Sequence, residues 1–293
     1  MEAPLSVGAY DVAGSNPAGS IKQLCLVIKK PYRNPVRKEG HMVTITISNL
    51  KGGIGKTTSA VNIAWSLAYE GKHVLVVDAD PQCNLTPFFQ RDNSKSHTIA
   101  DLLEKPENFR SCICRSRMKN VDIIKGCPEV LEAGEEEEAA LYKAFLNIQE
   151  KKRDEYDYMI IDTRPSFGGL TEASIYAADI LLTPVCLDNF CRDNLTLVDT
   201  YLDSIPERVR PVWKVFTNKV IPNRKVQRVI FEDLYSKHDY PIMESCIRSS
   251  ETVNTALQLY KPIQKHRSGC PVCVDYINLT DEIKNIAIER SEA

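Results

Sequence analysis

The chain has 293 residues, of which 43% are hydrophobic and 26% charged, and its formal net charge at pH 7 is −2. This composition is ordinary for a soluble globular protein, and no apolar run approaches the roughly 20 residues that a membrane span requires. The segment 1–42 holds six Lys or Arg against three acidic residues, so the remainder is acidic. Any nucleic-acid binding must therefore use a local basic patch and not a global positive field.

Residues 1–41 are rich in Gly, Pro and Ser and show no clear periodicity. This composition predicts a flexible leader. Met42 stands directly before the first convincing strand, so we interpret the leader as an upstream extension or an added remnant. Residues 42–293 are expected to form a single domain.

Segments with strand and helix character alternate from Val43 onward. Strands are expected at Val43–Ser48, His73–Val77, Tyr158–Ile161, Ile180–Val185 and Val212–Thr217, and helices at Thr57–Glu70, 98–104, 138–151, 170–178, 193–203, 225–237 and 275–288. Nearly continuous apolar strands are typical of a parallel sheet covered on both faces. The alternation predicts a doubly wound α/β fold, a mostly parallel sheet with helices on both faces. The acidic run Glu135–Glu138 is interpreted as a solvated loop leading into a helix.

A glycine-rich loop separates the first strand from the first helix, with the sequence Lys51-Gly52-Gly53-Ile54-Gly55-Lys56-Thr57-Thr58. The glycines let backbone N–H groups surround phosphate oxygens, and the helix that follows adds its positive N-terminal dipole. We expect Lys56 to reach the β- and γ-phosphates of ATP and the Thr57 hydroxyl to bind Mg²⁺. The loop departs from the usual phosphate-binding pattern, because Leu50 replaces its first glycine and Lys51 is an additional lysine.

Two carboxylates at strand ends complete the predicted chemistry. Asp162 ends an apolar strand and is placed to hold Mg²⁺, through water. Asp80 follows another strand end and is expected to orient the attacking water and to lie near the metal, while Asp78 supports the loop. Phosphoryl transfer requires mainly charge neutralisation and an in-line water, so these groups suffice for hydrolysis.

The departure at Lys51 is itself informative. A phosphate-binding loop that opens with lysine resembles the deviant Walker A motif of the ParA/MinD group of P-loop NTPases. Val76–Thr86 resembles the family stretch D-x-D-P-Q-x-N-x-T, and Asp157–Thr163 resembles its Walker B strand. Arg164 departs from the family, which usually has proline there.

Two weaker matches extend the resemblance toward the C-terminus. Asn218 lies where the family has a strand-end asparagine that contacts adenine, and Lys261–Ile283 resembles the region of the ParA C-terminal helix. The chain from about Met42 to Arg290 is thus identified as a member of the ParA-type partition ATPases, with 42–293 as one P-loop ATPase domain.

The resemblance implies a Mg²⁺-dependent ATP hydrolase, slow and stimulated by a partner. Lys51 is implied to reach the nucleotide of a second subunit, so that a homodimer forms on ATP and Lys51, Lys56 and Asp80 serve catalysis. A ParB-like centromere-binding partner and the partition of a plasmid, phage or chromosome origin are implied as well. The expected location is cytoplasmic, on the nucleoid.

Nonspecific binding to duplex DNA is expected through a concentrated basic patch. Candidates are Arg224, Lys225 and Arg228 at one helix start, and Arg248 with Lys261, Lys265 and Arg267 in the C-terminal third. Arg248 is the first choice, because Arg248–Glu251 resembles the family stretch that contains a DNA-contacting arginine.

Three alternatives stay open. A membrane-targeted MinD-like ATPase requires a basic amphipathic C-terminal helix, whereas the tail 281–293 is net acidic and no membrane binding is expected. A P-loop iron–sulfur carrier has a C-P-x-C motif after its adenine strand, whereas Cys270-Pro271-Val272-Cys273 comes much later. The third alternative is an ATP-gated DNA-binding module in which hydrolysis is incidental. It differs from a partition ATPase only in its rate of ATP turnover.

The ten cysteines, without a secretion signal, indicate reduced thiols in a cytosol. The single C-x-x-C motif, at Cys270 and Cys273, is either half of a metal site or a redox pair, or an ordinary helix start. We expect it to be dispensable for ATPase activity, because Pro271 suits the first turn of a helix.

Overall fold

A computed structural model describes residues 42–91 and 97–292; the predicted leader 1–41 lies outside these residues. Within the described ranges, eight strands form one sheet in the order β3-β4-β2-β5-β1-β6-β7-β8. The strands are β1 (Val43–Ile47), β2 (Val74–Ala79), β3 (Ile113–Arg115), β4 (Val121–Ile124), β5 (Tyr158–Thr163), β6 (Ile180–Cys186), β7 (Val212–Val220) and β8 (Ile242–Arg248). Among the strand pairs of the described residues, only the edge pair β3–β4 is antiparallel. The predicted mostly parallel α/β fold is therefore confirmed.

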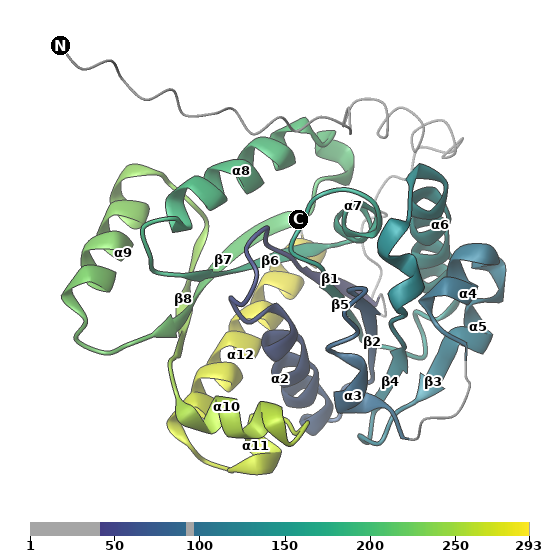
Figure 1. The fold of residues 1–293 in the computed structure, drawn as a ribbon, viewed down its shortest axis with the longest axis horizontal. Coiled ribbons are helices and arrows are strands. Elements are labelled where there is room, and N and C mark those ends of the chain that lie inside the picture. Colours follow the sequence, from purple (N-terminus) through teal and green to yellow (C-terminus); the bar gives the residue numbers. More distant parts are fainter. Residues whose placement is uncertain (1–41, 92–96, 293) are drawn as a thin grey trace.

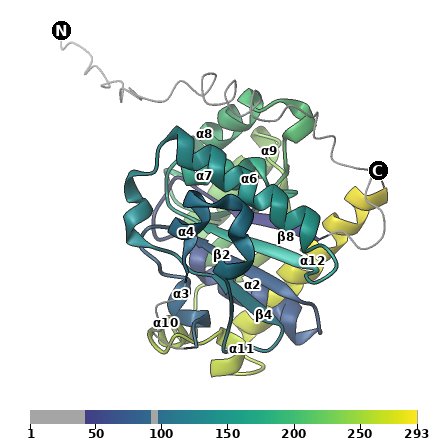
Figure 2. The same ribbon diagram turned by 90° about the vertical axis from the view of Figure 1, so that its right-hand side faces the viewer.

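Helices cover both faces of the sheet, as Figures 1 and 2 show. The first core contains apolar side chains of α2 (Lys56–Tyr69), α10 (Glu251–Gln258), α11 (Ile263–His266) and α12 (Pro271–Glu292), and α3 (Thr86–Phe89) adds two phenylalanines. The second core contains side chains of α4 (Ile99–Glu104), α5 (Phe109–Cys112), α6 (Glu135–Lys151), α7 (Leu170–Tyr176) and α8 (Cys191–Ser204). A smaller third cluster packs α9 (Lys225–Lys237) and α8 against β6 and β7.

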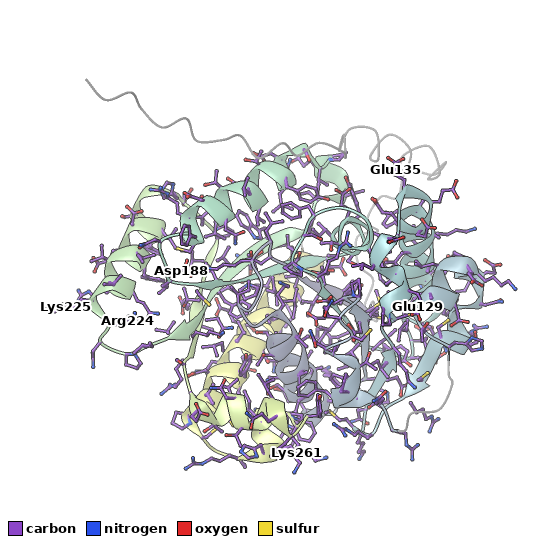
Figure 3. The ribbon with its side chains drawn as sticks, in the orientation of Figure 1. Glu129, Glu135, Asp188, Arg224, Lys225 and Lys261 are labelled. Atoms are coloured by element: carbon purple, nitrogen blue, oxygen red, sulfur yellow. The ribbon has the colours of Figure 1, made fainter. Side chains whose placement is uncertain are left out.

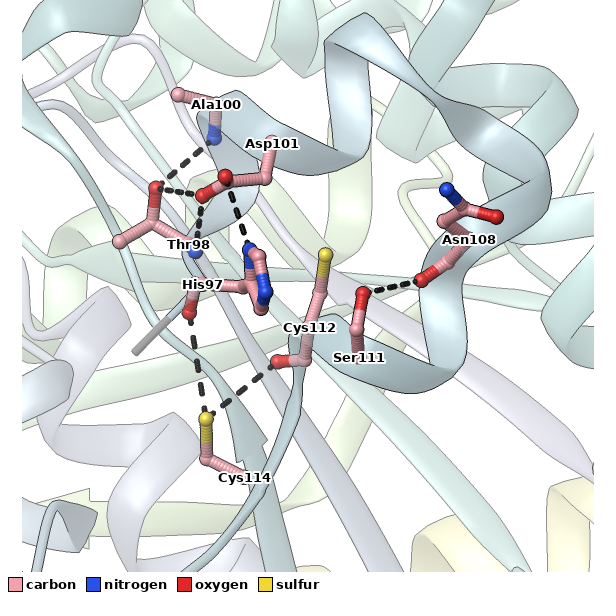
Figure 4. A network of polar contacts seen from close by, with 8 residues as sticks. All are labelled: His97, Thr98, Ala100, Asp101, Asn108, Ser111, Cys112 and Cys114. Carbon is pink, nitrogen blue, oxygen red and sulfur yellow. Dashed lines mark hydrogen bonds and ion pairs between the residues drawn. The ribbon is translucent and has the colours of Figure 1, made fainter. Parts of the chain in front are cut away.

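Local capping explains why α4 begins where the sequence predicts it. The Thr98 hydroxyl accepts a hydrogen bond from the Ala100 N–H at 3.2 Å, and the Asp101 carboxylate accepts one from the Thr98 N–H at 2.8 Å. His97 Nδ1 also lies 3.0 Å from Asp101 Oδ1 (Figure 4). This reciprocal capping satisfies backbone donors that a helix start otherwise leaves unpaired.

The structure corrects two local predictions. The acidic run Glu135–Glu138 is not a loop, because it forms the first turn of α6, where negative charge is favoured by the helix dipole, and Glu138 is buried. The C-terminal helix begins at Pro271 and not at residue 275. Among the described residues, no helix is both long and apolar enough for a membrane span.

The strand order brings the loops with the predicted motifs to one edge of the sheet. β1 pairs with β5, and β5 pairs with β2, so these three strands are neighbours. In the register of these pairs, Asp162 lies opposite Ile47 on one side and Asp78 on the other. The glycine-rich loop, the Asp78–Asp80 segment and the end of β5 therefore meet at the carboxyl edge.

Candidate active site

The glycine-rich loop joins β1 to α2 in a conformation that requires two of its glycines. Gly53 and Gly55 have φ angles of 72° and 94°, which side chains rarely tolerate. A Cβ atom on Gly55 would lie 2.3 Å from Asn218 Nδ2. That amide donates a hydrogen bond to the Ile54 carbonyl at 2.7 Å, so the end of β7 holds the loop in place.

Lys56 is the buried cation of the loop. Its Nζ donates to the carbonyl oxygens of Asn49 at 3.1 Å and Lys51 at 3.0 Å, so the ammonium is enclosed by the loop. Burial lowers the pKa of Lys56, and the charges of Asp162 and Asp80 partly offset this shift. A phosphate group bound in the loop would favour the charged form and restore the solvation that burial removes.

Asp162 has the features expected of a magnesium ligand. Its Oδ2 accepts a hydrogen bond from the Thr57 hydroxyl at 2.6 Å, and its Oδ1 is buried with no hydrogen-bond partner among the described residues. Burial, and then the nearby Asp78, raise the pKa of Asp162 well above the usual value. A cation that prefers oxygen ligands would compensate this isolated oxygen, so the residues fit Mg²⁺.

Mg²⁺ does not require a site made entirely of carboxylate ligands. Mg²⁺ is usually bound by one or two carboxylates together with phosphate oxygens and water. The described residues contain no group of three His, Cys, Asp or Glu side chains that could hold a metal. The Thr57–Asp162 pair therefore fits a metal that arrives with the phosphates of a nucleotide.

Asp78 and Asp80 have different surroundings. Asp78 Oδ2 accepts hydrogen bonds from the Thr86 N–H at 2.8 Å and the Thr86 hydroxyl at 2.7 Å, so Asp78 supports the loop, as expected. Burial raises the pKa of Asp78 to about 6. Asp80 lines the cavity described below, and its Oδ1 accepts a hydrogen bond from the Gln82 N–H at 2.9 Å. Only Asp80 is thus available to a water molecule beside a bound nucleotide.

A cavity with a volume of about 670 Å³ lies beside the loop. Its lining residues are Gly52, Gly53, Gly55, Lys56, Thr57, Thr58, Asp80, Gln82, Asn84, Phe88, Pro165, Asn218, Lys219, Ile247, Arg248, Ser249, Ser250, Val253, Asn254, Leu257, Tyr260 and Tyr276. It combines the predicted nucleotide residues with side chains from α3, α10 and α12. The sequence analysis did not predict this second wall, because the lining residues of α3 and α10 lie outside the matched motifs and the match that includes Tyr276 gave it no role at the site.

Lys51 turns toward its own chain. Its Nζ forms an ion pair with Asp188, in the loop between β6 and α8, and lies 5.7 Å from the centre of the Phe190 ring. The Lys51 and Asp188 side chains are 37% and 40% exposed, so the contact lies at the surface. No sequence signal marks Asp188 as a partner, because it lies 137 positions away.

Arg164, which departs from the family pattern, does not disturb Asp162. Its Nη1 and Nη2 donate to the carbonyls of Leu131 at 3.2 Å and Gly168 at 3.4 Å. The next residue, Pro165, lines the cavity. The arginine thus ties the loop after β5 to the segment before α6.

The candidate DNA-binding residues do not gather in one patch. Arg248 ends β8, and its Nε and Nη2 each donate to the Asp275 carboxylate at 2.7 Å. Arg224 and Lys225 lie at the start of α9, far from Lys261 near α11 (Figure 3). Arg228 pairs with Glu232 at 2.9 Å on the exposed side of α9. In the single chain, therefore, Arg248 is paired with Asp275, and the candidates near α9 and near α11 lie in different regions.

A parallel sheet, a phosphate-type loop at its carboxyl edge and converging Lys56, Thr57 and Asp162 define a P-loop NTPase. The AAA domain family model matches residues 42–215. The chromosome-partitioning ATPase Soj of Treponema pallidum is 33% identical over 247 residues, which cover 82% of this chain and 96% of Soj. The ParA family protein pGP5-D of the Chlamydia psittaci virulence plasmid is 29% identical over 249 residues, covering 83% and 95%.

The structures agree with the sequences. The ATP complex of an McdA variant from Cyanothece superposes with a TM-score of 0.71 at 21% identity, covering 84% of this chain and 97% of that chain. At this identity the likeness concerns the fold. Together with the sequence matches, these findings show that the chain belongs to the ParA-type P-loop ATPases.

Proposed function

We propose that this chain is a ParA-like ATPase that dimerises on ATP, binds duplex DNA without sequence preference and drives plasmid or chromosome partition. A ParB-like centromere-binding protein is the proposed partner and stimulates a slow hydrolysis, and the working location is the nucleoid. The observation that carries the proposal is the second lysine, Lys51, at a surface position beside a complete phosphate loop. Residues 42–293 are proposed to act as one domain, in which α12 packs back on α2.

The chemistry follows from the positions of the side chains. We propose that Lys51–Thr58 bind the phosphates, that Asn218 borders the adenine, and that Thr57, Asp162 and Asp80 hold Mg²⁺. Bound Mg²⁺ supplies neutralisation of phosphate charge. Asp80 orients the water for in-line attack, and Lys56 stabilises the charge that builds on the transferred group.

The C-terminal helix favours this reading over the membrane-targeted alternative. Tyr276, Leu279 and Ile283 are each at most 1% exposed and belong to the first core. The apolar face of α12 is therefore already used in packing. The C-x-x-C segment lies at the start of this helix and not in the loop after β7, which argues against the iron–sulfur carrier.

Substitution of Lys51 tests the cross-subunit role. Lys51→Ala is expected to keep most ATP affinity but to lose the ATP-dependent dimer, its turnover, or both, with turnover falling roughly 10²-fold, as for a lost transition-state donor. Light scattering and phosphate release measure the two effects. Asp188→Asn is the matched control, because it breaks the same ion pair but keeps the lysine. Normal dimerisation with normal hydrolysis in Lys51→Ala would exclude the role.

Salt titration tests DNA binding. With a slowly hydrolysed ATP analogue, wild type is expected to bind unrelated duplexes equally, and each lost phosphate contact should reduce the salt slope by about 0.9. Arg248→Ala should weaken binding on every sequence, while ATP binding and dimerisation survive.

Arg248→Ala removes two side-chain hydrogen bonds to the Asp275 carboxylate and keeps the one from the backbone N–H of residue 248, so its thermal unfolding must be measured alongside. The substitutions Arg224→Ala and Lys225→Ala are not expected to lower the stability of the fold, since both side chains are exposed. The partition proposal fails if wild type shows no ATP-dependent DNA binding in anisotropy titrations at low salt.

A further inference from the structure

The two thiols of Cys270-Pro271-Val272-Cys273 contact each other at the start of α12. Cys270 Sγ and Cys273 Sγ lie 2.8 Å apart. Both residues are buried, with 6% and 1% of their surface exposed. A disulfide bond places two sulfurs about 2.05 Å apart, so this pair already lies close to bonding distance.

The backbone holds the pair in this position. The Cys270 carbonyl accepts hydrogen bonds from the N–H groups of Cys273 at 2.9 Å and Val274 at 3.4 Å, so Cys270 directly precedes the first helical turn. Residues three apart at a helix start lie on one face. C-x-x-C motifs at the start of a helix are typical of reactive dithiols.

We propose that Cys270 and Cys273 form a reversible dithiol–disulfide site that exchanges with low-molecular-weight disulfides such as glutathione disulfide. Cys270 loses its proton and attacks one sulfur of the small disulfide, whose S–S bond breaks and releases a thiolate that takes up a proton. Cys273 then loses its proton, attacks Cys270 Sγ and releases the second small thiol. In total, two electrons pass from the protein pair to one disulfide, which becomes two thiols.

The surroundings of the two thiols indicate that Cys270 reacts first and Cys273 second. Ser268, Gly269 and Pro271 are exposed around Cys270, so a small disulfide has to displace only a surface turn. Cys273 lies deeper and its thiol donates to the Arg267 carbonyl at 3.2 Å. Burial, and then the hydrogen bond with Cys270, raise the pKa of Cys273 to about 12, so this thiol keeps its proton until the second step.

The site is separate from the nucleotide residues. Neither cysteine lines the cavity at the glycine-rich loop. Asp275, two residues further along α12, nevertheless holds Arg248 of the cavity wall. That the cysteines are dispensable for ATPase activity stays a prediction.

Alkylation in glutathione redox buffers tests the proposal on the full chain. Trypsin cleavage after Arg267 and Lys284 yields the peptide Ser268–Lys284, which contains these two cysteines and no other. As the buffer becomes oxidising, both thiols of this peptide are expected to lose alkylation together and its mass to fall by two hydrogens. Dithiothreitol should reverse the change.

Single variants test the assigned order. Cys273→Ser should accumulate a glutathione adduct on Cys270, whereas Cys270→Ser should leave Cys273 unmodified. The exposed Cys246 is the internal control, since it should take up glutathione without forming the intrapeptide bond. The proposal is overturned if the wild-type peptide stays a dithiol, or carries only glutathione adducts, in buffers that modify Cys246. The wild-type result does not depend on the folding of any variant.

Discussion

Lys56→Ala is expected to abolish measurable ATP binding. The Lys56 ammonium is buried and hydrogen-bonded to the carbonyls of Asn49 and Lys51, so its removal takes away the positive charge that the loop encloses. Charge-assisted hydrogen bonds contribute about 1.5–3 kcal/mol each, so losing two contacts to phosphate corresponds to roughly 10²–10⁴-fold in affinity. Titration calorimetry with ATP and Mg²⁺ measures the loss.

Lys51→Ala is the matched control for Lys56→Ala. It removes the same charge from the same loop, but from a position that faces Asp188 at the surface. The control is expected to bind ATP, and thermal unfolding without nucleotide should show that both variants are folded. Wild-type affinity in folded Lys56→Ala would show that the loop is not the nucleotide site.

Asp80→Ala is expected to bind ATP and dimerise but to hydrolyse about 10²–10⁴-fold more slowly. Asp80 lines the cavity and is oriented by the Gln82 N–H, whereas the proposed phosphate contacts come from the loop at the end of β1. Removing the carboxylate therefore affects the attacking water more than the bound nucleotide. Phosphate release at saturating ATP, with light scattering for the dimer, measures the two quantities.

Magnesium titration separates the two roles proposed for Asp80. If the residue positions water, turnover of Asp80→Ala stays low at every Mg²⁺ concentration. If it acts mainly as a metal ligand, high Mg²⁺ restores turnover. Asp154→Ala is a suitable control, because it removes a carboxylate that is 85% exposed and lies outside the cavity. Unchanged hydrolysis in Asp80→Ala would remove this residue from the mechanism.

Sequence patterns predicted most of the framework. The five predicted strands are all present, because each is a nearly continuous apolar run that must be buried on both faces. Three strands were not predicted. β3 and β4 have only three and four residues, and β8 has only two buried residues, Met243 and Ile247, so none of them is a long apolar run.

The convergence of the candidate nucleotide-site residues could also be predicted from the sequence. The residues of the glycine-rich loop are consecutive, and Asp80 and Asp162 each follow an apolar strand. In a parallel sheet the carboxyl ends of neighbouring strands meet at one edge, so local patterns are sufficient to bring these groups together. The hydrogen bond from Thr57 to Asp162 agrees with this expectation.

The partners of Lys51 and Arg248 were decided by the tertiary structure alone. The Lys51–Asp188 and Arg248–Asp275 pairs join residues 137 and 27 positions apart, and the basic residues of α9 and α11 lie in different regions. The thiol contact at Cys270 likewise depends on where α12 begins. Hydrophobic periodicity reports which face of an element is buried, but a surface charge can pair with any neighbour that packing supplies, so its partner is known only once the elements are assembled.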